Sequence, residues 1–214
     1  MEAQVISKKR VADHGEVLTG KREVNAMLDL VKSETERIDS RFLEPACGTG
    51  NFLTEILERK LRVVEKRYGN SPLDYERYAV LAVSSIYGID ILQDNVLECR
   101  RRLLAIFERR FESLFREEWL PAVKYIIERN IIWGDALTLN SVGETPHPII
   151  FSEWSLVNGS MIKRRDFTFH ELDSYAGIRG KPLFSDLGEE VFFPEPIKEY
   201  PLTHYLALAD VDKH

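Results

Sequence analysis

A glycine-rich turn between two apolar segments is the first feature of this sequence that could carry chemistry. Residues 42–44 are short and apolar at their centre, residues 45–50 read Pro-Ala-Cys-Gly-Thr-Gly, and a helical apolar pattern starts at Asn51, a good N-cap. Glycines in such a turn let a ligand approach the backbone closely, and the helix N-terminus behind them offers free N–H groups. The turn therefore indicates a nucleotide-like site, although a turn that only joins a strand to a helix would look the same.

Two further acids follow apolar segments downstream. Asp90 comes after Ile86–Ile89, and Asp135 comes after Ile131–Gly134. A carboxylate at the end of a second strand can accept hydrogen bonds from ribose hydroxyls, and one at the end of a third can accept from an adenine amino group. Each acid alone would be an ordinary cap or loop residue. Three successive strands ending in acids, the first of them Glu44, predict one site at the carboxyl edge of a parallel sheet.

The elements that would position these residues alternate along the chain. Apolar residues have helical spacing in segments 21–32, 51–68, 75–84, 94–115 and 119–128, and short strands are expected at 41–44, 86–91 and 130–133. This alternation predicts an α/β fold with a mainly parallel sheet and helices on both faces. The pattern weakens after Asp135: residues 148–151 are a candidate fourth strand, and the chain from Lys163 onward is mixed and contains several prolines.

The amino-acid composition and net charge limit the classes of protein to which this chain could belong. The 214 residues are 44% hydrophobic and 30% charged, which is ordinary for a globular chain, and 35 acids against 29 bases give a net charge of −6. A chain that binds DNA unaided is usually basic. Two cysteines exclude a disulfide framework or a zinc cluster, and the histidines have no metal-ligand spacing, so no metal site is expected. No signal peptide or membrane span is expected, which favours a cytoplasmic protein.

Four segments together resemble a known enzyme family. Residues 44–53, Glu-Pro-Ala-Cys-Gly-Thr-Gly-Asn-Phe-Leu, resemble motif I of the N6-adenine DNA methyltransferases, which are S-adenosylmethionine-dependent enzymes of bacterial restriction–modification systems. Residues 13–20 resemble motif X of that family, 87–91 resemble motif II and 130–137 resemble motif III. The resemblance covers about residues 8–140. It implies a Rossmann-like methyltransferase fold with an N-terminal helical segment.

The resemblance also implies which residues hold S-adenosylmethionine. The methionine part is expected beside Thr19 and Gly48, with its amino group near Glu44. The ribose is expected at Asp90 and the adenine amino group at Asp135. The full set of implied cofactor-binding residues is Thr19, Glu44, Pro45, Ala46, Gly48, Asn51, Phe52, Asp90, Ile91, Asp135 and Ala136.

The catalytic motif of the family has no clear counterpart. That motif is Asn/Asp/Ser-Pro-Pro-aromatic, and this sequence contains no Pro-Pro pair. At the expected distance stands Phe151–Ser155, where Ser152 or Glu153 could accept a hydrogen bond and Trp154 could stack on a flipped base. The alternative is a strand end with a core tryptophan. The catalytic residues therefore stay unassigned.

The sequence predicts that the chain has three parts. Residues 1–40 are a tail and helix with the motif X-like loop, 41–157 are the S-adenosylmethionine-binding core, and 158–214 are an irregular extension that is too short for a target-recognition domain. Within the extension, Lys163-Arg164-Arg165 follows Asn158-Gly159, and a hairpin tip there is the best candidate for a phosphate contact.

These expectations leave three functions open. The first is a DNA adenine-N6 methyltransferase, or the cofactor-binding part of a split or truncated one, that reaches DNA through a partner chain or domain such as a restriction–modification companion subunit. The second is a catalytically inactive S-adenosylmethionine-binding subunit or regulatory module. The third is a small-molecule or protein methyltransferase with its own acceptor site.

Overall fold

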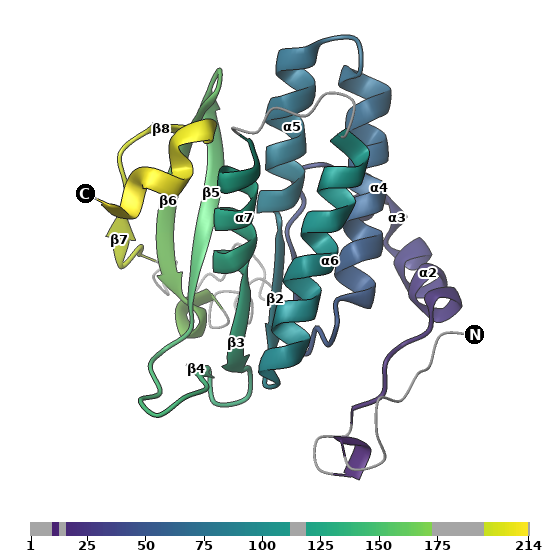
Figure 1. Cartoon of the computed structure of the whole chain (residues 1–214), viewed down its shortest axis with the longest axis vertical. Coiled ribbons are helices and arrows are strands. Elements are labelled where there is room, and N and C mark those ends of the chain that lie inside the picture. The colour runs from purple at the N-terminus through teal and green to yellow at the C-terminus, as the bar shows by residue number, and fades with distance from the viewer. Residues whose placement is uncertain (1–9, 13–15, 112–118, 173–194, 214) are drawn as a thin grey trace, which may run out of the picture.

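The chain has an α/β fold with two sheets, seen in a computed structural model that describes residues 10–12, 16–111, 119–172 and 195–213 (Figure 1). The first sheet consists of β1 (Phe42–Glu44), β2 (Ile86–Asp90), β3 (Ile131–Asp135) and β4 (Asn140–Ser141). The second consists of β5 (Ile150–Asn158), β6 (Met161–Thr168), β7 (Lys198–Glu199) and β8 (Thr203–His204). The first sheet is parallel from β1 to β3, and the other pairings are antiparallel.

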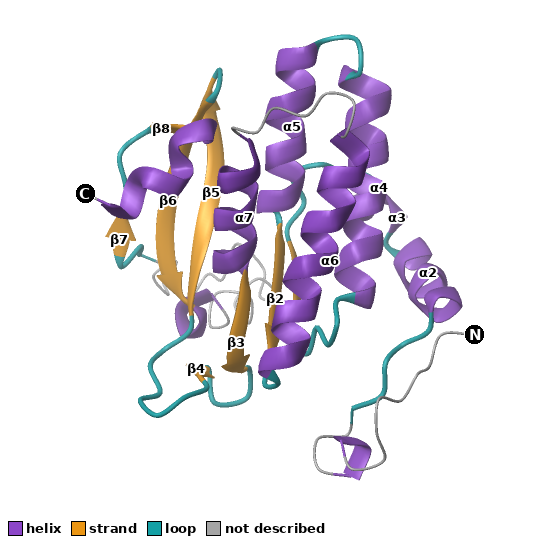
Figure 2. Cartoon of the chain, in the orientation of Figure 1, coloured by secondary structure: helices purple, strands orange, loops and turns teal. Residues whose placement is uncertain are grey.

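The helices precede β1, connect β1 to β2 and β2 to β3, and follow β8. They are α2 (Lys21–Leu30), α3 (Lys32–Thr35), α4 (Asn51–Tyr68), α5 (Pro72–Ser84), α6 (Gln93–Phe111), α7 (Trp119–Asn130) and the 3₁₀ helix η1 (Tyr205–Lys213). Helices α4 and α6 pack against each other, and α7 lies between α6 and the β5–β6 hairpin (Figure 2). In the described part of the chain, no helix combines the length and apolarity needed to cross a membrane.

The register of the parallel strands sets the position of the three predicted acids. Glu44 is the partner of Gly88, and Asp90 is the partner of Trp133, so β1, β2 and β3 end at the same edge of the sheet. Asp135 is the last residue of β3. The prediction that Glu44, Asp90 and Asp135 share one edge is confirmed, because successive parallel strands present their carboxyl ends together.

The two faces of the first sheet are covered differently. Neighbouring residues of a strand point to opposite faces of the sheet, so Gly88 of β2 lies toward one face and Tyr87 toward the other. A Cβ on Gly88 would lie 2.8 Å from the Leu53 side chain of α4. On the other face, the Tyr87 hydroxyl donates to the Ser152 carbonyl at 3.0 Å, and the Tyr87 ring meets Phe151 edge-on. The sequence predicted helices on both faces, but at Tyr87 the covering element is strand β5.

The β5–β6 hairpin also corrects two expectations about the C-terminal third. Residues 148–151 were expected to give a fourth strand of the parallel sheet and 158–214 to be irregular, yet β5 pairs antiparallel with β6 over its whole length. Gly159, at the turn, has a φ of 57°, as a tight hairpin turn requires. The polar residues that interrupt the apolar pattern form contacts with one another inside the hairpin. Buried Arg164, for example, forms an ion pair with buried Asp166.

Two element boundaries differ from expectation for local reasons. Gly50, in the left-handed region at φ 86°, is the N-cap of α4, so Asn51 is the first helical residue and not the cap. Helix α7 continues to Asn130, whose buried amide donates to the backbone carbonyls of Ser84 and Ile86. This amide joins the end of α7 to the start of β2, and β3 then begins at Ile131.

Lys60 of α4 is a fully buried cation at the opposite end of the sheet. Its ammonium donates to the carbonyls of Ile38 and Ser40 and to the Ser85 hydroxyl, and no carboxylate pairs with it among the described residues. Burial lowers the pKa of Lys60 to about 7. The ammonium ties the segment that enters β1 to the segment that enters β2, at the cost of a desolvated charge.

The buried ammonium predicts a pH-dependent stability. In the unfolded chain Lys60 keeps its proton up to about 10.4; in the folded chain it loses the proton above about 7. The unfolded state therefore binds more protons between these values, and the free energy of unfolding should rise with pH in this window, by at most about 1.4 kcal/mol per pH unit. In Lys60→Met this contribution should disappear.

The measurement is urea unfolding of both proteins from pH 6 to pH 10. The difference between the wild-type and Lys60→Met free energies of unfolding isolates this one group from the other titrating residues. A difference that stays constant across the range would contradict the buried-charge account.

Candidate functional site

A cavity of about 630 Å³ opens at the carboxyl ends of β1, β2 and β3. These are the lower ends of β2 and β3 in Figure 1. The eleven residues that the sequence singled out all line it. They are Thr19 before α2, Glu44 at the end of β1 with Pro45, Ala46 and Gly48 after it, Asn51 and Phe52 on α4, Asp90 at the end of β2 with Ile91 after it, and Asp135 at the end of β3 with Ala136 after it. Four separate segments of the chain therefore converge on one site.

The charges around this cavity have one sign. Its lining contains the carboxylates of Glu16, Glu44, Asp90 and Asp135, and none of its described lining residues is lysine, arginine or histidine. We call it the acidic cavity. Burial raises the pKa of Glu44, and a backbone hydrogen bond from Ala46 offsets part of that effect. Such a lining favours cations and hydrogen-bond donors, and it disfavours phosphate groups.

The glycine turn is shaped by its own packing. Gly48 and Gly50 have φ values of 53° and 86°, in the region that only glycine adopts easily. A Cβ on Gly50 would lie 2.6 Å from the Cys99 sulfur of α6, and one on Gly48 would lie 3.2 Å from Leu18. Gly50 therefore allows α4 and α6 to approach each other, and Gly48 allows residues 16–20 to pass over the turn.

Asp90 accepts three hydrogen bonds at the acidic cavity. Its Oδ1 accepts from the backbone N–H of Leu92 at 2.9 Å and from the Asn95 amide at 3.2 Å. Its Oδ2 accepts from the backbone N–H of Gly48 at 2.7 Å. A carboxylate oxygen has about two lone-pair sites, so Oδ1 is saturated and Oδ2 keeps one site for a ligand. Asp90 is thus arranged to accept one ligand hydroxyl, where the sequence suggested two.

Asp135 forms the opposite wall of the cavity. Its Oδ1 accepts from the backbone N–H of Leu137 at 2.9 Å, and its Oδ2 accepts from the Thr138 hydroxyl at 3.1 Å. Each oxygen keeps a free lone-pair site. The side chains of Ile91 and Leu137 are 45% and 95% exposed beside it, an unusual position for large apolar groups. A carboxylate flanked by exposed apolar surface suits a flat ring that carries an amino group.

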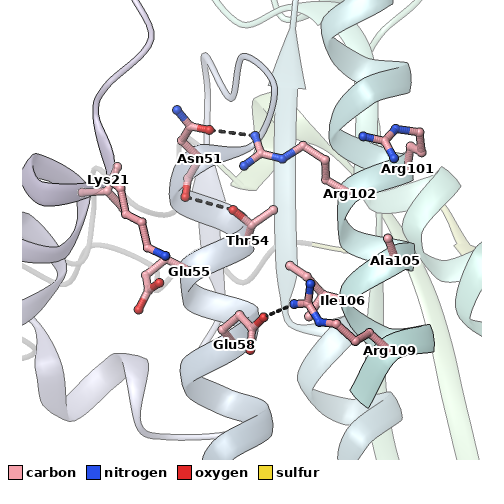
Figure 3. A pocket seen from close by; sticks show the side chains of 11 residues that line it. Lys21, Asn51, Thr54, Glu55, Glu58, Arg101, Arg102, Ala105, Ile106 and Arg109 are labelled. Atoms are coloured by element: carbon pink, nitrogen blue, oxygen red, sulfur yellow. Dashed lines mark hydrogen bonds and ion pairs between the residues drawn. The ribbon is translucent and has the colours of Figure 1, made fainter. Parts of the chain in front are cut away.

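Residues 16–20, which we call the N-terminal strap, close one side of the acidic cavity. Asn51 Nδ2 donates to the Thr19 carbonyl at 2.8 Å, and Asn51 Oδ1 accepts from Arg102 at 2.7 Å. Figure 3 shows Arg102 reaching from α6 across to Asn51, above a smaller groove of about 280 Å³. Arg102 also donates to the Thr49 carbonyl at 2.8 Å. Asn51 is therefore a brace between α6 and the strap. Residues 13–15, the start of the motif X-like segment, lie outside the described residues.

Sequence reasoning missed several residues of the cavity. Glu16, Val17, Leu18, Cys47, Leu92, Asn95, Gly134 and Leu137 also line it. Glu16 lies inside the motif X-like segment, which was the available signal. Asn95 has no local signal, because only the contact of α6 with the strap gives its amide a role.

The Phe151–Ser155 segment does not reach the acidic cavity. Trp154 is 3% exposed in the middle of β5, and its indole N–H donates to Asn130 at 2.9 Å. Trp154 and Ser155 line a separate cavity of about 910 Å³ with Phe42, at the other end of β1. The core-tryptophan alternative is correct, and Trp154 cannot stack on a base held at the acidic cavity in this structure.

The neighbouring polar residues of β5 are engaged as well. The Ser152 hydroxyl donates to Asp166 at 2.7 Å inside the hairpin. Glu153 forms ion pairs with Arg41 and Arg165. Neither side chain is available as a hydrogen-bond acceptor for a methyl-accepting amine.

The basic cluster at 163–165 is also internal to the fold. These residues lie within β6 and not at the hairpin tip. Lys163 pairs with Glu199 at 2.9 Å, and buried Arg164 pairs with Asp166 at 2.6 Å. The expected hairpin-tip position is wrong, and the three cations pair with acids of the second sheet; a phosphate contact at this cluster stays a prediction.

Comparisons with known proteins identify no match for this chain. A scan against protein-family models, a search of curated proteins and a search of solved structures each found no match.

Proposed function

We propose that the acidic cavity binds S-adenosylmethionine, and that the chain is the cofactor-binding part of a DNA adenine-N6 methyltransferase. One observation carries the proposal: carboxylates at the ends of three parallel strands face one cavity whose described lining has no cationic side chain. The strand order β1–β2–β3, with α4 and α6 in the connections, further supports a Rossmann-like methyltransferase fold. A pyrophosphate-containing dinucleotide would meet repulsion here, and a cationic nucleoside would not.

The lining offers partners for three polar groups of that ligand. Glu44, whose pKa is raised by burial, would pair with the amino group of the methionine part. The free site on Asp90 Oδ2 would accept a ribose hydroxyl, and Asp135 would accept from the adenine amine, with Ile91 against the ring. When bound, S-adenosylmethionine supplies an electrophilic methyl group on a positively charged sulfur.

The methyl acceptor would be brought by another chain or domain. Phe52 is the one aromatic residue in the described lining of the acidic cavity, and it belongs to the cofactor motif; Trp154, at the place of the family's stacking group, lies elsewhere. The net charge of −6 opposes unaided approach to DNA phosphates. A split or truncated enzyme of a restriction–modification system, in the cytoplasm and with a basic companion subunit, fits both facts.

The second candidate is a catalytically inactive S-adenosylmethionine-binding subunit. The engagement of Ser152, Glu153 and Trp154 inside the β5–β6 hairpin favours it. Tritium transfer from labelled S-adenosylmethionine to duplex DNA separates the two candidates. Turnover by the purified chain alone would exclude the inactive module.

Binding of S-adenosylmethionine is the first test. We expect calorimetry to show saturable binding below millimolar ligand. Asp135→Ala should weaken it roughly tenfold to a hundredfold, because a hydrogen bond to a charged acceptor contributes about 1.5–3 kcal/mol. Glu144→Ala is the matched control: it removes the same charge from an exposed loop residue that does not line the acidic cavity. No heat of binding at millimolar ligand would overturn the proposal.

The Glu44 carboxyl predicts how affinity depends on pH. Burial raises its pKa in the free protein, so more of it is protonated in mildly acidic solution than of an ordinary glutamate. A cationic amine binds only the ionised form. Affinity should therefore be full above the raised pKa and should fall by up to tenfold per pH unit below it.

The check is a calorimetric titration of wild type and Glu44→Gln from pH 4.5 to pH 8. The variant should bind more weakly at pH 8 and should lack the decline toward low pH. A decline of equal steepness in both proteins would assign it to a different group and would remove Glu44 from the amine contact.

A further inference from the structure

A chain of polar contacts runs from Asp90 away from the acidic cavity. The Asn95 amide donates to Asp90 Oδ1 at 3.2 Å and to Glu16 Oε1 at 2.7 Å. Arg10 in turn donates to Glu16 Oε1 at 2.8 Å and to Asn95 Oδ1 at 3.0 Å. The side chain of Arg10 also pairs with Asp94 in the first turn of α6. Five residues from three segments thus form one network at the cavity wall.

Asn95 is the centre of this network. It is 2% exposed, both hydrogens of its amide are donated to carboxylates, and its oxygen accepts from Arg10. The amide group of asparagine donates two hydrogen bonds without carrying a charge, so it can satisfy two carboxylates that face each other. An aspartate here would gather three carboxylates, and a leucine would remove one hydrogen-bond donor from each of the two carboxylates.

Arg10 supplies the positive charge that the network needs. The Glu16 side chain is only 8% exposed and lies close to buried Asp90, which is unfavourable unless a cation compensates. The guanidinium of Arg10 spans Glu16, Asp94 and Asn95 with its planar set of donors, which a single ammonium cannot do. It lowers the pKa of Asp94 as well. Arg10 therefore fastens the strap to α6.

We propose that Asn95 and Arg10 are positioning residues of the acidic cavity. Asn95 holds Asp90 so that Oδ2 keeps the one free acceptor site for a nucleoside hydroxyl. Arg10, through Glu16, holds the N-terminal strap over the bound ligand. This inference rests on the proposed binding of S-adenosylmethionine and names residues that the motifs do not contain.

The network also couples the strap to the ligand. Because Asp90 touches the ligand and Glu16 belongs to the strap, ordering of one stabilises the other, and the coupling is reciprocal. Bound ligand should therefore protect the backbone amides of the strap from exchange. Breaking the network should weaken binding and remove that protection together.

The test compares Arg10→Met and Asn95→Leu with wild type and with Arg22→Met. Arg22 is the matched control, because its side chain is 95% exposed, it lies outside the cavity lining, and its loss changes the net charge equally. Calorimetry gives the affinity for S-adenosylmethionine, and hydrogen exchange gives the protection of residues 17–19 with and without it. We expect a roughly three- to tenfold loss of affinity in Arg10→Met and at least that in Asn95→Leu.

A second readout separates positioning from general stability. In Arg10→Met the ligand should no longer protect residues 17–19, while exchange in α4 and α6 without ligand stays as in wild type. Arg10→Lys, which keeps the charge but cannot span three acceptors, should fall between wild type and Arg10→Met. If Asn95→Leu fails to fold, the Arg10 variants decide the matter.

The outcomes distinguish this inference from the function on which it rests. Wild type that binds no S-adenosylmethionine would overturn both. Wild type that binds, with Arg10→Met equal to Arg22→Met in affinity and in strap protection, would overturn the positioning role and leave the proposed function intact.

Discussion

The carboxylate of Asp90 joins the glycine turn to the start of α6, although Gly48 lies 42 residues before Asp90 in the sequence. It accepts from the Gly48 N–H in the turn after β1, from the Leu92 N–H after its own strand, and from Asn95 on α6. The glycine turn can adopt its left-handed geometry because this acceptor meets its N–H, and α6 can start beside the turn because Asn95 meets the same group. These contacts fix the glycine turn and the start of α6 around the acidic cavity, whereas strand register places Glu44 and Asp135.

The part of the site that the sequence predicted is the part that local rules determine. A short apolar strand that ends in an acid can be recognised from the sequence alone. Parallel pairing of the strands then brings Glu44, Asp90 and Asp135 to one edge of the sheet. Asn95 and Glu16 escaped prediction because their roles arise only when α6 meets the strap, 79 residues apart in the sequence. Whether the implied residues hold S-adenosylmethionine stays a prediction.

The β5–β6 hairpin shows why the C-terminal third was harder to predict. Its inward positions include Ser152, Arg164 and Asp166, so the apolar alternation that marks a half-buried strand is missing. These polar groups satisfy one another, which makes their burial tolerable but leaves no trace in the sequence. The same burial engages Ser152 and Trp154, which stand at the place of the family's catalytic motif, and this supports the proposal that a separate chain or domain brings the methyl acceptor.

The compensation of charge around the acidic cavity differs from one carboxylate to the next. Asp90 has three N–H donors, Asp135 has a backbone N–H and a hydroxyl, and Glu16 has the guanidinium of Arg10. Glu44 has only a backbone hydrogen bond, and burial raises its pKa. A ligand cation therefore gains most beside Glu44, where protein donors neutralise the charge least. Protein N–H donors occupy all but one acceptor site of Asp90, whereas the charge of Glu44 is balanced by a single backbone hydrogen bond. This arrangement would suit a ligand that places a hydroxyl at Asp90 and an amine at Glu44.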